Sequence, residues 1–187
     1  MSKGKYNLKG NAFNKIKLFI DKNPAEGMKY SDFFKQSQAD FPEMLIPSSW
    51  YNVDVYYQII NLYSIRKKIA LTDLIQQLAE FALESDLNGI YKFIMKVGGP
   101  KRVLNSALPM VKTYFDYINI SVLNNSDGNL EFESVLPTQY VELSIPADRG
   151  AVSGMLKASG ARMKEFEVLS VTGLNETHSK IHYRVRY

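Results

Sequence analysis

The hydrophobic periodicity of this chain changes near residue 117, and that change limits the folds that it can adopt. Before Tyr117, apolar residues recur every three or four positions, as in helices that bury one face. From Ile118 onward they alternate with polar residues, as in strands with one buried face. The sequence therefore predicts an α+β fold in a single domain, 1–187, with a mainly helical part at 1–117 and a ββαββ part at 118–187.

Turn residues divide the helical part into amphipathic segments. We expect helices at about 10–22, at 31–38 with Ser31 as N-cap, and from Ser48 or Ser49 through residue 63. Further segments follow at about 72–82, 87–97 and 100–117. Gly98-Gly99-Pro100 should end one helix and begin the next, because glycine suits a C-cap and proline a first turn. Pro109 predicts a kink or break inside the last segment.

The ββαββ part contains two predicted hairpins with a helix between them. Asp127-Gly128 marks the turn of the first hairpin, and Ser144 should cap the helix, which ends near Gly160. Gly150 and Gly154 predict that this helix lies close to the sheet. A turn between Asn175 and Glu176 sets the register of the second hairpin. The expected pairs are Phe166–Val185, Val168–Tyr183, Ser170–Ile181, Glu167–Arg184 and Glu165–Arg186.

The residues that carry common enzyme chemistry are missing or badly placed. The chain has no cysteine and only two histidines, His178 and His182. In a strand these two lie about 13 Å apart, too far to share a zinc ion, and no catalytic triad follows from them. The acidic pairs Glu131/Glu133 and Glu165/Glu167 are interpreted as solvated. No phosphate-binding or other catalytic motif is present, so we expect no enzyme activity.

Charge and hydropathy argue against two further classes of partner. The net charge is +4, and the basic residues of the last strand have no exposed aromatic side chains among them, so nucleic-acid binding is not expected. The lysine-rich start of the chain is interpreted as a solvated helix face. No apolar run reaches about 18 residues, so we expect no transmembrane segment, and no signal peptide is recognised. The absence of cysteine fits a cytoplasmic location.

Several longer segments resemble those of an uncharacterised bacterial family that is expanded in myxobacteria. They are LKGNAFNKIKLFI, LIPSSWYNVDVYYQII and NGIYKFIMKVGGPKRVLNSALPMVKTYFD, followed by the closing hairpins. That family is similar to the superfamily of haem–nitric-oxide-binding domains, vinyl-reductase domains and small TRAPP trafficking subunits. The resemblance implies an α/β fold that encloses an apolar cavity between helices and sheet. It also implies dimerisation through helices.

Two cofactors of that superfamily are not expected from the residues present. Haem-binding members use a helical histidine and a Tyr-x-Ser-x-Arg motif, whereas this chain has Tyr63-Ser64-Ile65-Arg66 and no histidine before residue 178. Vinyl-reductase domains often hold zinc through cysteines, which this chain lacks. The sequence therefore argues against both haem and zinc, and leaves an empty pocket, an organic ligand or a filled core.

Six aromatic or sulfur-containing residues are candidates for the lining of such a pocket. Trp50 and Tyr51 precede a helix and could border a cavity opening. Core packing is the more frequent explanation for aromatic residues at helical spacing, and we assign Tyr56, Ile60 and Tyr63 to the core. The remaining candidates, by the same logic, are Tyr91, Met95, Tyr114 and Phe115.

The sequence leads to two functional hypotheses. The first is a non-enzymatic, cytoplasmic signalling or regulatory module that acts through protein–protein interaction, as a homodimer or with a partner protein. The alternative is a sensor domain that binds a small hydrophobic or lipid-like molecule in an apolar cavity. Uptake of an apolar ligand would separate the two, because an interaction module instead predicts an exposed apolar patch.

Overall fold

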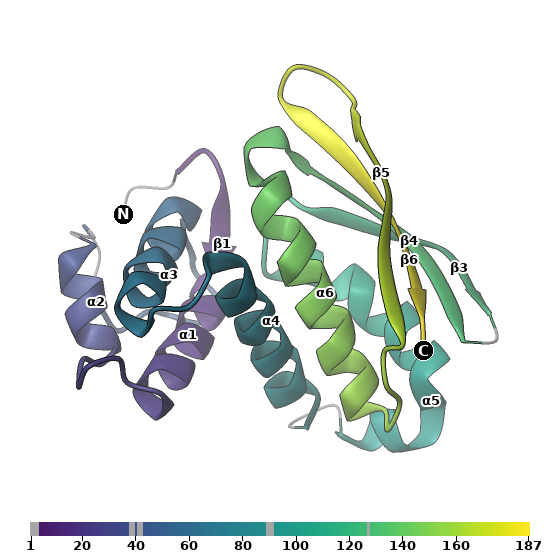
Figure 1. The fold of residues 1–187 in the computed structure, drawn as a ribbon, viewed down its shortest axis with the longest axis horizontal. Helices are drawn as coiled ribbons and strands as arrows, with labels where there is room; N and C mark the ends of the chain where they lie inside the picture. The colour runs from purple at the N-terminus through teal and green to yellow at the C-terminus, as the bar shows by residue number, and fades with distance from the viewer. Residues whose placement is uncertain (1–3, 38–39, 41–42, 89–91, 127) are drawn as a thin grey trace.

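Helices dominate the chain before residue 118, and a four-stranded sheet with one long helix follows it (Figure 1). A computed structural model describes residues 4–37, 40, 43–88, 92–126 and 128–187. The first part contains β1 (Asn7–Lys9), α1 (Gly10–Lys22), α2 (Tyr30–Gln36), β2 (Trp50–Asn52), α3 (Val53–Lys67), α4 (Leu71–Asn88), α5 (Lys92–Ala107) and the 3-10 helix η1 (Leu108–Thr113). The second contains β3 (Asn119–Ser126), β4 (Asn129–Pro137), the 3-10 turn η2 (Thr138–Tyr140), α6 (Val141–Ala158), β5 (Glu165–Gly173) and β6 (His178–Arg186).

Most helices follow the predicted segments, but several N-termini differ, and the predicted start of the segment 87–97 falls in α4 and in residues 89–91, outside the described part of the chain. Helix α1 has the predicted bounds, whereas Asn52 caps α3 by accepting a hydrogen bond from Asp54 N at 2.9 Å. The preceding residues pair with β1 in a small antiparallel sheet that the periodicity did not reveal. In α2 the carboxylate of Asp32 accepts from Lys29 N at 2.8 Å. The predicted serine caps at positions 31, 48, 49 and 144 are therefore wrong.

Both predicted interruptions near the end of the helical part, at Gly98-Gly99-Pro100 and at Pro109, are present. Gly99 has φ 63° and ψ 175°, a conformation that side chains with a Cβ rarely adopt, and the helix resumes at Pro100. After Ala107 the backbone tightens into η1, which contains Pro109. Because proline cannot donate an α-helical hydrogen bond, the tighter turn follows from the sequence.

The main sheet is antiparallel, with strand order β3-β4-β6-β5. Phe166 pairs with Val185 and Val168 with Tyr183, as predicted. A bulge after Val168 then shifts the register, so the predicted Ser170–Ile181 pair is wrong and Ser170 instead faces His182. The predicted charge pairs are also present: Arg184 lies 3.6 Å from Glu167 and Arg186 lies 3.4 Å from Glu165.

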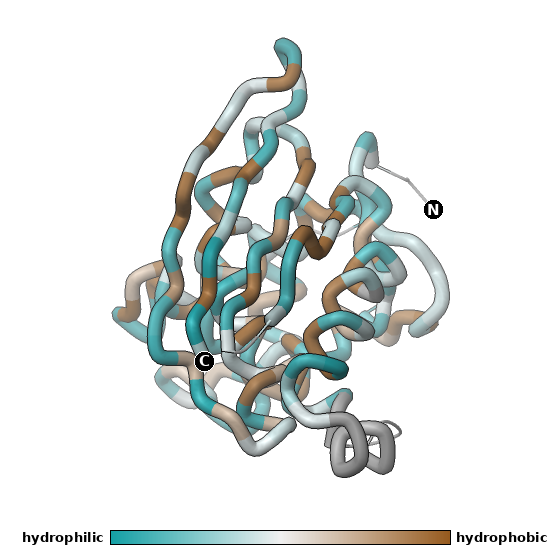
Figure 2. Tube along the Cα trace, turned by 90° about the vertical axis from the view of Figure 1, so that its right-hand side faces the viewer, coloured by the Kyte–Doolittle hydropathy of each residue, from teal (hydrophilic) through white to brown (hydrophobic). Residues whose placement is uncertain are grey.

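Helix α6 covers the apolar face of this sheet and also packs on α4 (Figure 1). The alternation of hydrophobic and hydrophilic residues along the strands is visible in Figure 2. A Cβ on Gly154 would lie 2.7 Å from the carbonyl oxygen of Glu80, and a Cβ on Gly150 would collide with that of Gln76. The two glycines therefore permit close approach to α4, not to the sheet as predicted.

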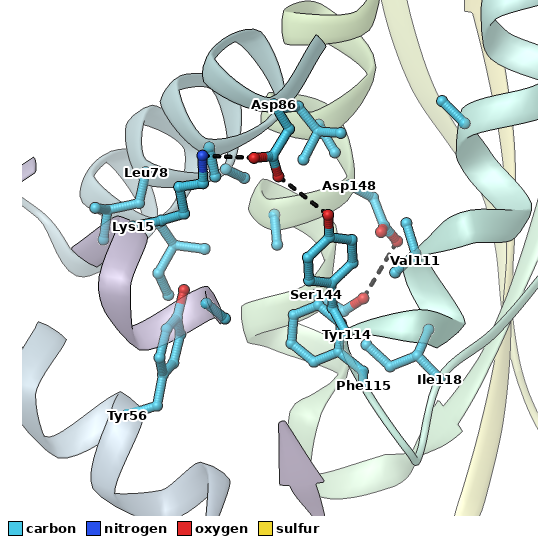
Figure 3. A pocket seen from close by; sticks show the side chains of 18 of the residues that line it. Lys15, Tyr56, Leu78, Asp86, Val111, Tyr114, Phe115, Ile118, Ser144 and Asp148 are labelled. Carbon is cyan, nitrogen blue, oxygen red and sulfur yellow. Dashed lines mark hydrogen bonds and ion pairs between the residues drawn. The ribbon is translucent and has the colours of Figure 1, made fainter. Parts of the chain in front are cut away.

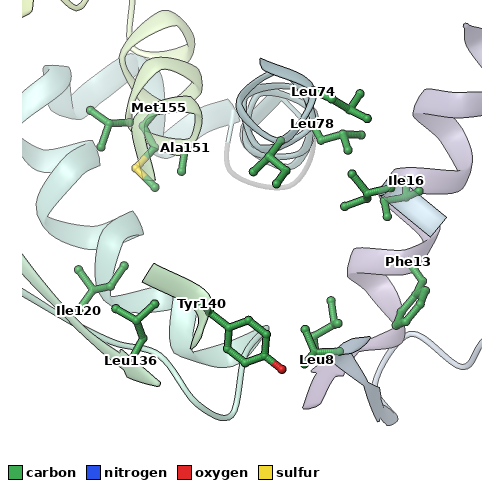
Figure 4. Packing of buried hydrophobic residues seen from close by; sticks show 14 of the residues in the cluster. Leu8, Phe13, Ile16, Leu74, Leu78, Ile120, Leu136, Tyr140, Ala151 and Met155 are labelled. Carbon is green, nitrogen blue, oxygen red and sulfur yellow. The ribbon is translucent and has the colours of Figure 1, made fainter. Parts of the chain in front are cut away.

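The buried core draws on both parts of the chain. Ile16 and Leu78 come from helices of the first part, whereas Leu136 and Met155 come from β4 and α6. Figure 4 shows these side chains grouped around a central space. Separately, no helix in the described part of the chain is long and apolar enough to cross a bilayer.

Candidate ligand-binding cavity

A cavity of about 360 Å³ lies where the helical part meets α6 and the sheet (Figure 3). Ligand pockets in proteins generally measure about 300–1,000 Å³, so this volume suits a small molecule. The lining comes from α1, α3, α4, α5, η1 and the segment after it, the end of β4, η2 and α6. The lining residues are Ala12, Lys15, Ile16, Tyr56, Tyr57, Ile60, Ile75, Leu78, Ala79, Ala82, Leu83, Asp86, Arg102, Val103, Ser106, Ala107, Val111, Tyr114, Phe115, Tyr117, Ile118, Leu136, Tyr140, Ser144, Ala147, Asp148 and Ala151.

Small side chains on several helices contribute to this space. Ala12 of α1, Ala82 of α4 and Ala147 of α6 all line the cavity. Because an alanine side chain fills little volume, these positions contribute to the space between the helices. An unfilled cavity lowers the stability of the folded protein. Its presence therefore calls for a functional explanation.

Tyrosine rings form one wall of the cavity. Tyr57 of α3 stacks on Tyr140 with ring centroids 5.6 Å apart, and Tyr117 lies 5.1 Å from Tyr140. The hydroxyl of Tyr140 donates to the carboxylate of Asp54 at 2.9 Å. Burial is the main cause that raises the pKa of Tyr57 to about 12. The tyrosines of this wall are therefore neutral phenols at physiological pH.

Tyr56 presents a hydroxyl to the cavity. Its ring lies deep in the protein yet keeps some accessible surface, and Tyr56 is one of the lining residues. Figure 3 shows the hydroxyl end of the Tyr56 ring on the side of α1, below Lys15. The described residues provide no hydrogen-bond partner for it, so this oxygen is available to a ligand.

A charge-neutral network joins three segments at one end of the cavity (Figure 3). Lys15 Nζ of α1 lies 2.5 Å from Asp86 Oδ1 of α4 and 3.0 Å from Ser85 Oγ. The hydroxyl of Tyr114 donates to Asp86 Oδ2 at 3.1 Å. Because the lysine and the aspartate neutralise each other, this end offers little net charge to a ligand.

Asp148 is the second carboxylate in the wall, and it is buried. Its Oδ2 accepts hydrogen bonds from the hydroxyls of Tyr183 at 2.7 Å, Ser134 at 3.1 Å and Ser144 at 3.2 Å. Burial raises the pKa of Asp148 to about 6, and these three hydrogen bonds oppose that rise. Asp148 is thus an acid that changes charge close to physiological pH.

The structure brings some of the predicted lining residues together and separates others. Tyr114 and Phe115 line the cavity. Trp50 and Tyr51 lie in β2 and are absent from the lining. Trp50 has Lys9 Nζ 5.3 Å from its ring centroid, and the buried hydroxyl of Tyr51 accepts from the backbone N–H of Ile46.

Two of the six predicted residues cannot be placed. Tyr91 lies outside the described residues. Met95 belongs to α5, but its side chain is not among those described. A pocket lined by the six residues therefore stays a prediction.

The sequence reasoning missed the tyrosine wall and the buried carboxylate. Tyr56, Tyr57 and Ile60 line the cavity from α3, whereas the sequence predicts core packing for Tyr56 and Ile60, because aromatic stripes at helical spacing usually pack. Asp148 carried a usable signal: it lies one helical turn after Ser144 on a side of α6 that also carries apolar residues. A lone acid in that position indicates a buried polar contact.

The histidines take no part in the cavity. His178 and His182 lie on β6, and neither is a lining residue. His182 Nε2 lies 3.7 Å from Glu131 Oε2 on the charged face of the sheet. Across the described ranges, no group of three or more histidine, aspartate or glutamate side chains is arranged to hold a metal ion.

Comparison with known proteins gives similar structures but no sequence family. No family model and no curated protein matches the chain. An H-NOX protein from K. algicida, in its unliganded Fe(II) form, is 13% identical with TM-score 0.68, over 96% of this chain and 97% of that one. An oxygen-binding H-NOX domain related to soluble guanylate cyclases is 11% identical with TM-score 0.67, over 95% and 91%.

A third similar structure comes from work on haem distortion in the H-NOX family, with TM-score 0.73 and 11% identity over 96% and 95% of the two chains. The chain has the H-NOX fold. The distant likeness to haem–nitric-oxide-binding domains that the sequence suggested is confirmed at the level of the fold.

The same matches correct the expectation that haem is an unlikely cofactor, which is wrong as an argument from sequence alone. The solved structures that share the H-NOX fold over nearly the whole chain include haem proteins. The sequence argument considered only one type of iron ligand, a helical histidine. Tyrosine also ligates haem iron, in catalases, and this cavity is rich in tyrosine.

Proposed function

We propose that this chain is a ligand-binding sensor domain whose central cavity takes a small, largely apolar molecule. The observation that carries the proposal is the cavity of about 360 Å³ with a mostly apolar and aromatic lining. Apolar lining supplies affinity, and a few polar groups orient the ligand. Tyr56, Tyr117 and Asp148 are among the polar groups in this wall that keep an oxygen without a hydrogen bond to the described residues.

The position of the cavity provides a route from binding to output. Its walls come from α1 and α3 on one side and from α6 on the other, so an occupant contacts both parts of the chain. Two arrangements of α1 and α3 relative to α6 can differ in how well they fit a ligand. A ligand that binds one arrangement more tightly raises the population of that arrangement. The output is then a change in surface shape that a second copy or a partner protein reads, without catalysis by this domain.

Haem is one candidate occupant, because proteins with this fold bind it. Among the lining residues Tyr56 is a candidate iron ligand, since its phenol lines the cavity and its hydroxyl has no hydrogen bond to the described residues. Burial raises the pKa of Tyr56, so coordination would require the phenol to release its proton. When bound, haem supplies an iron centre for a diatomic gas. The role of this chain would be to enclose the ring and provide an oxygen ligand.

Native mass spectrometry of the purified chain tests the proposal. We expect the wild type to carry or take up an apolar molecule that is lost on denaturation. Ala82→Phe places a large side chain in the cavity and should abolish uptake, whereas Thr72→Phe, exposed on the same helix, should not. Uptake that persists in Ala82→Phe, or that never occurs in the wild type, would contradict the proposal.

Titration with hemin, followed by visible absorbance, then identifies the class of occupant. A band of protein-bound haem that weakens in Tyr56→Phe assigns the cavity to haem with a tyrosine ligand. Tyr30→Phe is the matched control, because the Tyr30 hydroxyl is buried, has no hydrogen bond to the described residues and lies outside the cavity lining. Uptake of apolar probes without such a band assigns the cavity to another organic ligand.

An interaction module remains the second candidate function, and one observation favours it. The edge strand β5 exposes Val168 and Val171, and Leu174 is exposed just beyond its end. Exposed apolar residues on an unpaired strand edge are suited to pairing with another chain. The same mass spectra test this candidate, because a homodimer without bound ligand would favour interaction over sensing.

A further inference from the structure

Asp148 has no cationic partner among the described residues. Its three hydrogen bonds all come from neutral hydroxyls, and all three reach Oδ2. Oδ1 accepts no hydrogen bond from the described residues, and Asp148 lines the cavity. One oxygen of a buried acid is therefore open on the cavity side.

This arrangement is energetically incomplete. A buried carboxylate is costly unless a cation or a full set of hydrogen bonds compensates for its lost hydration. The hydroxyls of Ser134, Ser144 and Tyr183 compensate for one oxygen. A donor delivered by a ligand would compensate for the other, and a charged nitrogen would do so most strongly.

The other charges of the wall do not supply that donor. Lys15 is bound to Asp86 at 2.5 Å, so its charge is already neutralised. Arg102 lines the cavity but is exposed at the protein surface, where solvent screens it. The uncompensated charge in the interior of the wall is the negative charge of Asp148.

The neighbouring aromatic rings favour the same ligand chemistry. Besides burial, the charge of Asp148 contributes to raising the pKa of Tyr57, which means that the two side chains are close enough to interact. Tyr57 stacks with Tyr140, and both rings line the cavity. Aromatic faces attract cations, so a carboxylate beside tyrosine rings forms a suitable environment for an ammonium group.

We propose that the cavity selects an apolar molecule that carries an ammonium group, and that Asp148 binds this group through Oδ1. The inference rests on the proposed function, since it names the ligand class for the same cavity. In this proposal, Tyr57 and Tyr140 contact the cation. The helix faces that carry Ala12, Ala82 and Ala147 contact the apolar body of the ligand. A carboxylate-bearing ligand of the same shape is repelled by Asp148.

Matched probes of three charges test the proposal by isothermal titration calorimetry at about pH 7.5. One series is naphthylmethylamine, naphthalenemethanol and naphthoate, and the other is decylamine, decanol and decanoate. The variants are Asp148→Asn, which removes the charge, and Glu142→Gln, which makes the same change at an exposed position of α6. Circular dichroism establishes that both variants are folded.

We expect the wild type to bind an amine about tenfold to a hundredfold more tightly than the matched carboxylate, the range for a hydrogen bond between charged groups. Asp148→Asn should lose this preference while it still binds the neutral alcohol. Glu142→Gln should behave as the wild type. If Asp148→Asn does not fold, the affinities of the wild type for amine and carboxylate probes still show whether the cavity prefers an ammonium group.

Two results would overturn the inference, and they differ in what they leave standing. Equal affinity for amine and carboxylate, or a preference for the carboxylate, would refute the role of Asp148 but keep the cavity as an apolar binding site. Failure of every probe in both series to bind would refute the inference together with the proposed function.

Discussion

At the residue scale, Asp148 links the stability of the fold to the cavity. Its hydrogen bonds tie α6 to β4 through Ser134 and to β6 through Tyr183. The same side chain lines the cavity. A residue with both roles cannot be optimised for stability alone, which is typical of polar groups at binding sites.

The raised pKa of Asp148 predicts a specific pH dependence of stability. The folded protein holds this proton up to about pH 6, whereas the unfolded chain releases it near 3.8. The stability that Asp148 contributes is therefore present below pH 4 and lost as the pH rises through 6, by about 3 kcal/mol in the free energy of unfolding.

Urea unfolding of the wild type and Asp148→Asn between pH 4 and pH 7 measures this contribution. The asparagine variant cannot titrate at this position, so the difference in unfolding free energy, wild type minus variant, should fall as the pH rises. A difference that stays constant over this range would show that Asp148 titrates alike in the folded and unfolded states.

At the element scale, α4 and α6 approach closely at two glycines. Gly150 and Gly154 let the backbones approach until carbonyl oxygens of α4 occupy the space of a Cβ. The sequence showed the spacing of the two glycines but not their partner. Sequence spacing identifies a small-residue face, and only the tertiary fold determines which element packs against it.

Gly150→Ala should destabilise the protein despite the higher helix propensity of alanine. Propensity alone favours alanine by about 0.5–1 kcal/mol. The new Cβ, however, collides with the carbonyl oxygen of Gln76, and backbone shifts of that kind cost about 1–3 kcal/mol. A lower urea midpoint than the wild type is expected, with Ser153→Ala on the same helix as the control. A higher midpoint would mean that the helices separate freely.

Particular elements show why some of the fold could be predicted from the sequence. The pairs Phe166–Val185 and Glu167–Arg184 follow from local alternation, and both are correct. The predicted register beyond Val168 is wrong, because a bulge adds a residue to β5 without any change in the hydrophobic pattern. β1 and β2 were missed because three-residue strands carry too little periodicity to detect.

At the scale of the whole molecule, the cavity results from helices that converge from both parts of the chain. Tyr114 and Phe115 were among the predicted lining residues, but Tyr56 and Asp148 were not. Apolar spacing shows that a side chain faces inward, and it gives no sign of whether that interior is filled. A prediction of the empty space needs the placement of all the surrounding helices at once.

An occupant that touches both parts should protect both from hydrogen exchange. With decylamine bound, amides of α3 and of α6 should exchange more slowly together, because the ligand lowers the population of open states on each side. Mass spectrometry of peptides from the two helices measures the effect, with Ala82→Phe as the control that does not bind. Protection restricted to one helix would mean that the walls respond separately.

The packing of α4 against α6 also bears on how the chain is made. The ribosome releases α4 well before Gly150 and Gly154 are synthesised, so the surface of α4 that these glycines will cover stays open meanwhile. Contacts so distant in sequence form late in folding. The surface of α4 that α6 covers is therefore exposed in the nascent chain until α6 is synthesised.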